Sequence, residues 1–198
     1  MKRYIILFLV VMTVIPLYGE FKILAGIDFS RYQLYQDDAE DIWGHTRWGL
    51  TGGIGFEHRI FDFLWLEFDL TVIQKGSRLE SEEGDVFYRY QAASAPFLLK
   101  WKPFFHTSPY LLGGAEIQYG LSHKRNLKQD ETEDIKSSTN LFGWGIAVGA
   151  GLEWKFKEHL FLFLEIRYSN GMSNLEGGFL NIKALKSRTL IFYMGIKS

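Results

Sequence analysis

The sequence has no cysteine among its 198 residues, so disulfide frameworks and thiolate metal sites are excluded. It has only 4 prolines, and beyond its first residues it has no apolar run of the roughly 20 residues that a membrane-spanning helix requires. It also lacks an excess of either charge, because 22 basic residues stand against 23 acidic ones. A balanced chain of this kind offers no basic surface to nucleic acid, so we expect no nucleic-acid partner.

Aromatic residues, which favour strands, are abundant and make up 17% of the chain. Between residues 142 and 156 every second residue is apolar, and the residues between them are glycine, alanine or charged. A period of two indicates a strand and not a helix. An apolar face opposite a small and charged face is typical of a membrane strand, with lipid outside and a crowded polar lumen inside.

Export is indicated by the N-terminus. Lys2 and Arg3 precede a short apolar run, and the small residue Gly19 suits a cleavage site. The run is too short to anchor the chain in a bilayer. We therefore predict a signal peptide at 1–19 and one mature domain at 20–198. An exported chain of membrane strands belongs in the outer membrane of a bacterium with two membranes.

Alternation of the same kind predicts eight strands, at residues 21–30, 47–57, 64–75, 87–101, 110–121, 142–156, 160–169 and 189–197. Pro96 lies within the fourth segment, where its missing N–H counts against a regular ladder. Eight strands of roughly ten residues match the smallest outer-membrane barrels, in which closure removes the sheet edges. The predicted fold class is all-β, an eight-stranded antiparallel transmembrane β-barrel.

The connections between these strands alternate in length. Short ones are predicted at 58–62, 102–108 and 155–159. Long polar ones are predicted at 31–46, 76–86, 122–140 and 170–187. This asymmetry indicates short periplasmic turns and long extracellular loops, with both chain termini on the periplasmic side.

Five short segments carry a family resemblance: Ile73-Gln74-Lys75-Gly76-Ser77, Pro96-Phe97-Leu98-Leu99-Lys100, Pro109-Tyr110-Leu111-Leu112-Gly113-Gly114, Gly149-Ala150-Gly151-Leu152-Glu153 and Glu165-Ile166-Arg167-Tyr168. With them the chain resembles the PorT-like family of outer-membrane β-barrel proteins, which are small barrels like that of OmpA. The resemblance implies a fold far better than an activity. It also implies two partners, the outer-membrane lipids and the barrel-assembly machinery during insertion.

Charged residues are predicted to face the lumen, and acidic and basic groups are mixed among them. They are Glu57, Glu67, Asp69, Lys75, Arg89, Lys100, Glu116, Glu153, Glu165 and Arg167. Isolated charges in a narrow lumen are costly to desolvate, so we expect opposite charges to pair into a network that fills the barrel. The alternative is acid and base catalysis by Glu67 and Asp69, which lie two residues apart on one face.

Two other patterns suggest chemistry. The segment Arg167-Tyr168-Ser169-Asn170-Gly171 resembles the His-x-Ser-Asn element of outer-membrane lipid A deacylases, but an arginine that stays protonated replaces the histidine and cannot activate a serine. His58, His106 and His159 fall in three short turns, where three imidazoles could hold zinc, although interfacial turn residues are a commoner role. We expect no catalytic residue, no cofactor and no metal site.

The first predicted loop is the best candidate for recognition, because its aromatic residues Tyr32, Tyr35 and Trp43 offer contact area. No ligand can be named. The function that the sequence favours is a non-enzymatic outer-membrane barrel with a structural or surface-interaction role. The alternatives are a small-solute or lipid transporter or pore, a lipid A-modifying esterase, and a soluble lipid-binding barrel with its apolar face turned inward.

Overall fold

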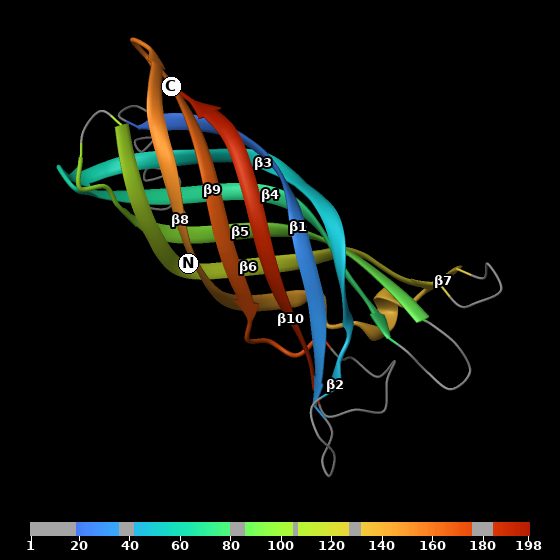
Figure 1. Cartoon of the computed structure of the whole chain (residues 1–198). Helices are drawn as coiled ribbons and strands as arrows, with labels where there is room; N and C mark the ends of the chain where they lie inside the picture. The colour runs from blue at the N-terminus through green and yellow to red at the C-terminus, as the bar shows by residue number, and fades with distance from the viewer. Residues whose placement is uncertain (1–18, 36–41, 80–85, 105–106, 127–131, 176–183) are drawn as a thin grey trace, which may run out of the picture.

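The computed structural model describes residues 19–35, 42–79, 86–104, 107–126, 132–175 and 184–198. Eight long antiparallel strands wrap into a closed barrel (Figure 1). They are β1 (Glu20–Tyr35), β3 (His45–Phe61), β4 (Leu64–Leu79), β5 (Val86–Trp101), β6 (Thr107–Asn126), β8 (Phe142–Lys157), β9 (Leu160–Gly171) and β10 (Ala184–Lys197). Shorter elements are β2 (Ile42–Trp43), β7 (Thr132–Asp134) and a 3₁₀ turn, η2 (Lys136–Ser138). In the described part of the chain, no helix is long and apolar enough to cross a membrane.

The barrel closes where the last strand, β10, pairs with the first, β1. This pairing runs from Lys22 opposite Lys197 to Tyr35 opposite Ala184. Phe21 and Ser198 extend it with two backbone hydrogen bonds of 2.9 and 3.0 Å. Every long strand therefore has two neighbours, and the hydrogen-bonding edges of an open sheet are absent. The predicted eight-stranded antiparallel barrel is confirmed.

The two ends of the barrel differ. One end, which we call the turn end, holds the connections at 62–63 and 158–159 together with Glu20 and Ser198. The other, which we call the loop end, holds β2, β7 and η2 (Figure 1). β2 pairs with β1, and β7 pairs with the end of β6, so the loop end carries ordered strand extensions.

The predicted faces of the strands are confirmed. On the outward face of β3, Trp48 and Leu50 are 66% and 54% exposed, whereas the inward Thr51 is 7% exposed. On β8, Val148 is 49% exposed and its neighbour Ala147 is fully buried. Similar outward apolar residues occur on all eight strands. An apolar surface of this extent is far larger than soluble monomers tolerate, and it matches the lipid-facing band of a membrane barrel.

The strands are longer than the sequence predicts. β6 has 20 residues and β4 has 16, against the ten or so that cross a bilayer. The extra residues lie mainly at the loop end, where polar residues such as Arg31 and Gln33 of β1 still pair with β10. Alternation of apolar and polar residues ends where the lipid ends, but backbone pairing does not depend on it, so the sequence pattern underestimates strand length.

β5 passes through Pro96 with its register intact. The pairs Phe68 with Phe97 and Thr71 with Ser94 share one register with β4. Pro96 itself is buried and lies opposite Glu116 of β6. The missing N–H removes a donor at one position, while the pairs on both sides hold the strand in place. The signal peptide stays a prediction, because residues 1–18 lie outside the described residues.

Replacing Val148 by arginine should prevent assembly of the barrel. Val148 is in the middle of the outward face of β8, and an arginine that faces lipid at the bilayer midplane costs about 2 to 4 kcal/mol. The matched control is Val148→Leu, which keeps the face apolar. The measurement is heat-modifiable migration of protein from the membrane fraction. Equal assembly of both variants would show that this face does not meet lipid.

Candidate functional site

An ion-pair network occupies the interior at the turn end. Five basic and five acidic side chains that are at most 7% exposed take part, and a further carboxylate, the partly exposed Glu20, lies 2.5 Å from Lys197 at the rim. The buried side chains are Lys22, Lys100, Lys102, Arg167, Lys197, Glu57, Glu67, Asp69, Glu153 and Glu165. Equal numbers of opposite charges remove the need for counter-ions in a lumen that has little room for water.

Arg167 is the centre of one half of this network. Its Nη1 lies 3.0 Å from Asp69 Oδ2, and its Nη2 lies 2.9 Å from Glu67 Oε1 and 2.5 Å from Glu165 Oε1. Lys22 supplies the second positive charge, with Nζ 2.5 Å from Glu67 and 2.8 Å from Asp69. A planar guanidinium with five N–H donors suits a site where several carboxylates converge.

Three lysines hold the other half. Lys197 Nζ lies 2.9 Å from both Glu57 and Glu153, and Lys100 Nζ lies 2.6 Å from Glu57. Lys102 Nζ lies 2.7 Å from Glu153. A longer contact of 3.6 Å between Lys100 and Glu67 joins the two halves. Glu67 therefore belongs to both halves of the network.

The contact between Lys22 and Asp69 crosses β3 at Gly55. β3 lies between β1 and β4, and Gly55 is opposite Lys22 on one side and Asp69 on the other. A Cβ atom at Gly55 would collide with Lys22 Cε and with Asp69 Oδ1. Glycine at this position therefore leaves the space in which the two charged side chains meet.

A smaller polar layer lies at mid-height. Glu116 accepts a hydrogen bond of 2.5 Å from Ser94 Oγ and another from Ser169 Oγ. Lys75 Nζ donates to Gln118 Oε1 at 2.9 Å. These five side chains come from β4, β5, β6 and β9 and are all buried. Bonds between them satisfy polar groups that would otherwise lose their contacts with water.

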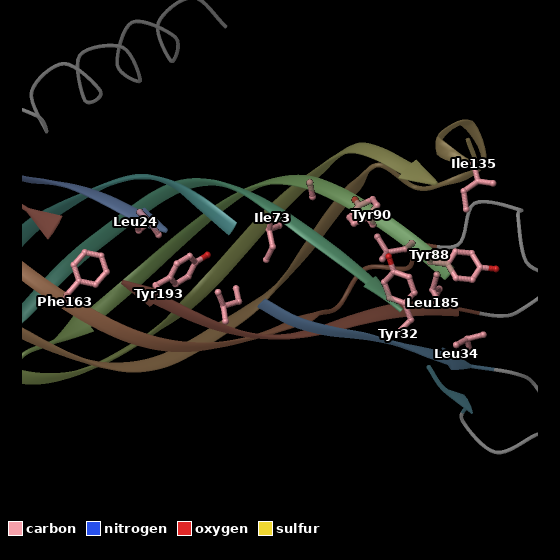
Figure 2. Close-up of a cluster of buried hydrophobic side chains, with 13 residues drawn as sticks. Leu24, Tyr32, Leu34, Ile73, Tyr88, Tyr90, Ile135, Phe163, Leu185 and Tyr193 are labelled. Atoms are coloured by element: carbon pink, nitrogen blue, oxygen red, sulfur yellow. The ribbon is translucent and has the colours of Figure 1, made fainter. Parts of the chain in front are cut away.

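Aromatic rings fill the interior at the loop end (Figure 2). The ring centroids of Tyr32, Tyr88 and Tyr90 lie 6.4, 6.1 and 5.3 Å from that of His123. His123 lies beyond the outward apolar band of β6, and its Nδ1 is 2.7 Å from Thr139 Oγ1. Burial lowers the pKa of His123 to about 4, against the opposing effect of Asp134, so the imidazole is uncharged at neutral pH.

Two predictions about single residues are wrong. Arg89 is predicted to face the lumen, but it is exposed, because its neighbours Tyr88 and Tyr90 occupy the inward positions of β5. Tyr32 is predicted to lie in a recognition loop, but it is fully buried because β1 continues to Tyr35. The side chains of Tyr35 and Trp43 lie outside the described residues.

The other nine predicted lumen charges are buried. Seven of them belong to the network, while Lys75 and Glu116 belong to the layer at mid-height. Three basic members of the network are not among the predicted lumen charges: Lys22, Lys102 and Lys197. Alternation already indicates the inward position of Lys22 and Lys197, but their importance follows from closure, which makes them direct neighbours across β1 and β10.

The structure assigns no catalytic geometry to the residues considered above. Glu67 and Asp69 are both ion-paired with Arg167, and the hydroxyl of Ser169 is bonded to Glu116. Among the described residues, no group of three or more His, Asp or Glu side chains is placed to hold a metal ion. His106 lies outside the described residues.

Arg167→Leu should destabilise the barrel by about 3 to 5 kcal/mol, because it leaves buried carboxylates without their partner. Arg167→Lys keeps the positive charge and should therefore destabilise the barrel less than Arg167→Leu does. The control is Arg125→Leu, which breaks the exposed pair of Arg125 and Glu133 and should cost at most about 1 kcal/mol. Urea titration in detergent micelles measures the free energy of unfolding of all three variants. A similar midpoint for Arg167→Leu and Arg125→Leu would contradict the central role of Arg167.

Comparison with known proteins places this geometry in a family. Residues 39–177 match the model of the outer membrane protein beta-barrel domain. Among solved structures, OprG from Pseudomonas aeruginosa is similar with 13% identity and a TM-score of 0.59, over 91% of this chain and 95% of OprG. Neisserial surface protein A is similar with 14% identity and a TM-score of 0.54, over 89% of this chain and 95% of that protein.

No curated protein matches the sequence. At identities this low the two solved structures show a shared fold alone, and the family follows from the domain match, which covers more than half of the chain. The chain belongs to the outer membrane protein beta-barrel domain family and is a β-barrel protein of the bacterial outer membrane.

Proposed function

We propose that the protein is a closed, non-enzymatic barrel whose role is structural or depends on contacts made by its loop end at the cell surface. The observation that carries this proposal is the filling of the lumen. Ion pairs occupy the turn end, a serine and glutamate layer lies at mid-height, and tyrosines occupy the loop end. An eight-stranded barrel has an interior just wide enough for side chains, which agrees with this filling.

The finer family assignment is also a proposal. The segments that resemble PorT-like barrels support placing the chain near that branch of small outer-membrane barrels. The proposed orientation puts the turn end in the periplasm and the loop end outside, as expected for barrels with short periplasmic turns. The outer-membrane lipids and the barrel-assembly machinery remain the proposed partners.

The surroundings of Ser169 argue against an esterase. Ser169 is 1% exposed, and its hydroxyl donates to Glu116, which Ser94 also contacts. An ester in the outer leaflet has no approach to a hydroxyl that is enclosed by the barrel wall. Arg167, which takes the place of the deacylase histidine, is bound to three carboxylates. This environment supports a packing role for Ser169.

The loop end presents an ordered extension that suits surface contacts. β6 continues to Asn126 and pairs with β7, and Arg125 and Glu133 form an exposed ion pair of 2.6 Å. Ile135 is buried and its N–H donates to the carbonyl oxygen of His123 in β6 at 3.0 Å, while Thr139 Oγ1 lies 2.7 Å from His123 Nδ1, so the extension is tied to the barrel. Such anchoring reduces the conformational entropy that the loop end would lose on binding a partner. Tyr35 and Trp43 remain candidates for recognition.

The purified protein should give no single-channel steps in planar bilayers with concentrated KCl, because charged and aromatic side chains fill its interior. Lys100→Gln provides a test of any conductance that does occur, since Lys100 is buried in the ion-pair network. Reproducible steps in the unmodified protein whose size changes in Lys100→Gln would favour the pore and reject the closed barrel.

The absence of native cysteine permits a clean test of orientation. Ser137→Cys places a thiol in η2 at the loop end, and His159→Cys places one in the turn between β8 and β9; both positions are exposed. A membrane-impermeant maleimide should label Ser137→Cys on intact cells and His159→Cys only after the cells are opened. The reverse pattern would show that the loop end faces the periplasm.

A further inference from the structure

A basic groove of about 550 Å³ lies on the outer wall at the loop end. Its lining residues come from the beginning of β3 and β5 and from the end of β4 and β6. They are His45, Thr46, Arg47, Arg78, Phe87, Arg89 and Asn126. Three are arginines, and none of these described lining residues is acidic. We call this feature the arginine groove.

Strand register brings the basic residues together. His45 is opposite Arg78, and Arg78 is opposite Phe87, so these three side chains form one row across β3, β4 and β5. Arg89 lies opposite Gly76, two residues from Arg78 along β4, and it is exposed like Arg78. The guanidinium of Arg78 lies over the ring of Phe87, with 5.7 Å between Cζ and the ring centroid. Two charged groups therefore share one outward face on adjacent strands.

Arg47 completes the groove through a local irregularity. The register between β3 and β4 shifts between Thr46 and Thr51, and Arg47 Nη1 donates to the carbonyl oxygen of Tyr88 in β5 at 3.1 Å. Its side chain passes Gly76, where a Cβ atom would lie 2.8 Å from Arg47 Cδ. The hydroxyl of Ser30 bonds to both backbone groups of Gly76, at 2.8 and 3.1 Å. Glycine and the shifted register thus bring a third guanidinium to the same place.

The groove lies just beyond the lipid-facing band. Trp48, 66% exposed, is an outward aromatic residue beside Arg47, and Leu50 and Val72 continue the apolar face toward the turn end. Exposed aromatic residues mark the membrane interface in barrels. Burial and then the neighbouring charge of Arg89 lower the pKa of Arg47, against the opposing effects of Tyr32 and Asp28. Positive charges of the groove therefore act on one another at the height of lipid headgroups.

We propose that the arginine groove binds the phosphate group of a phosphorylated lipid headgroup in the outer leaflet. Guanidinium groups match phosphate oxygens with paired N–H donors, and three of them around one groove suit a doubly charged group. The membrane itself supplies the ligand next to the groove. The proposal rests on the proposed orientation, with the loop end outside, which the cysteine labelling tests separately. It does not depend on whether the barrel has a structural or a surface-interaction role.

The test compares two double variants that each remove two positive charges from the loop end. Arg78→Gln/Arg89→Gln changes the groove. Lys186→Gln/Arg188→Gln changes outward residues of β10, which β1 separates from β3. The full mature protein is purified in mild detergent and mixed with lipid A that carries its phosphates, with enzymatically dephosphorylated lipid A, or with phosphorylated lipid A together with soluble pyrophosphate. Native mass spectrometry measures the bound lipid, and heat-modifiable migration verifies folding.

The unmodified protein and the β10 variant should retain phosphorylated lipid A, and the groove variant should retain it at least about tenfold less. Four outcomes would overturn the proposal. They are failure of the unmodified protein to retain the lipid, equal retention of the dephosphorylated form, equal loss in both double variants, and binding of soluble pyrophosphate in place of lipid. Failure to retain the lipid would show that the groove is not a lipid site, and equal retention of the dephosphorylated form would indicate that acyl-chain packing holds the lipid. Equal loss in both variants would indicate a general effect of charge at the rim, and binding of pyrophosphate in place of lipid would indicate a site for soluble anions.

Discussion

Charge compensation inside a closed wall is the constraint on which the rest of the structure depends. Closing eight strands leaves a lumen without room for hydrated ions, so each buried carboxylate requires a protein cation. At the turn end the network meets this requirement with five buried acidic and five buried basic side chains. Lys22 and Lys197 come from the two strands that close the barrel. Closure and neutrality are therefore linked, because an open barrel would separate these lysines and expose the carboxylates.

Neutrality is reached across the lumen and not along the sheet. Glu57 and Glu67 lie directly opposite each other on β3 and β4, and Lys22 and Lys197 do so on β1 and β10. Neighbours of like charge are destabilising in an isolated sheet. Curvature brings β1, β4 and β9 around a common space, and there Arg167 and Lys22 meet Glu67 and Asp69. The network thus favours the closed barrel over any flat arrangement of the same strands.

The sequence predicts which face of each strand meets lipid, because that face is defined by a local period of two and needs no knowledge of neighbours. It predicts the contacts less well. Lys22 and Lys197 matter only once β1 meets β10, which is a long-range event. The sequence predicts a loop at Tyr32 because the apolar alternation of β1 stops before the strand does. The error at Arg89 has a different cause, because local alternation was sufficient there. Its neighbours Tyr88 and Tyr90 face inward, so alternation itself places Arg89 on the outward face.

The arginines inside the barrel and those on its outer wall have different electrostatic surroundings. At the turn end, Arg167 is surrounded by carboxylates that the chain itself provides. At the loop end, the groove collects Arg47, Arg78 and Arg89, and none of its described lining residues is acidic. The interior at that height supplies one carboxylate, Asp28, whose charge acts on Arg47, and it otherwise consists mainly of tyrosines and an uncharged His123. In the proposed orientation the groove lies at the edge of the apolar band in the outer leaflet, and there the lipid headgroups supply the negative charge that the proposal assigns to it.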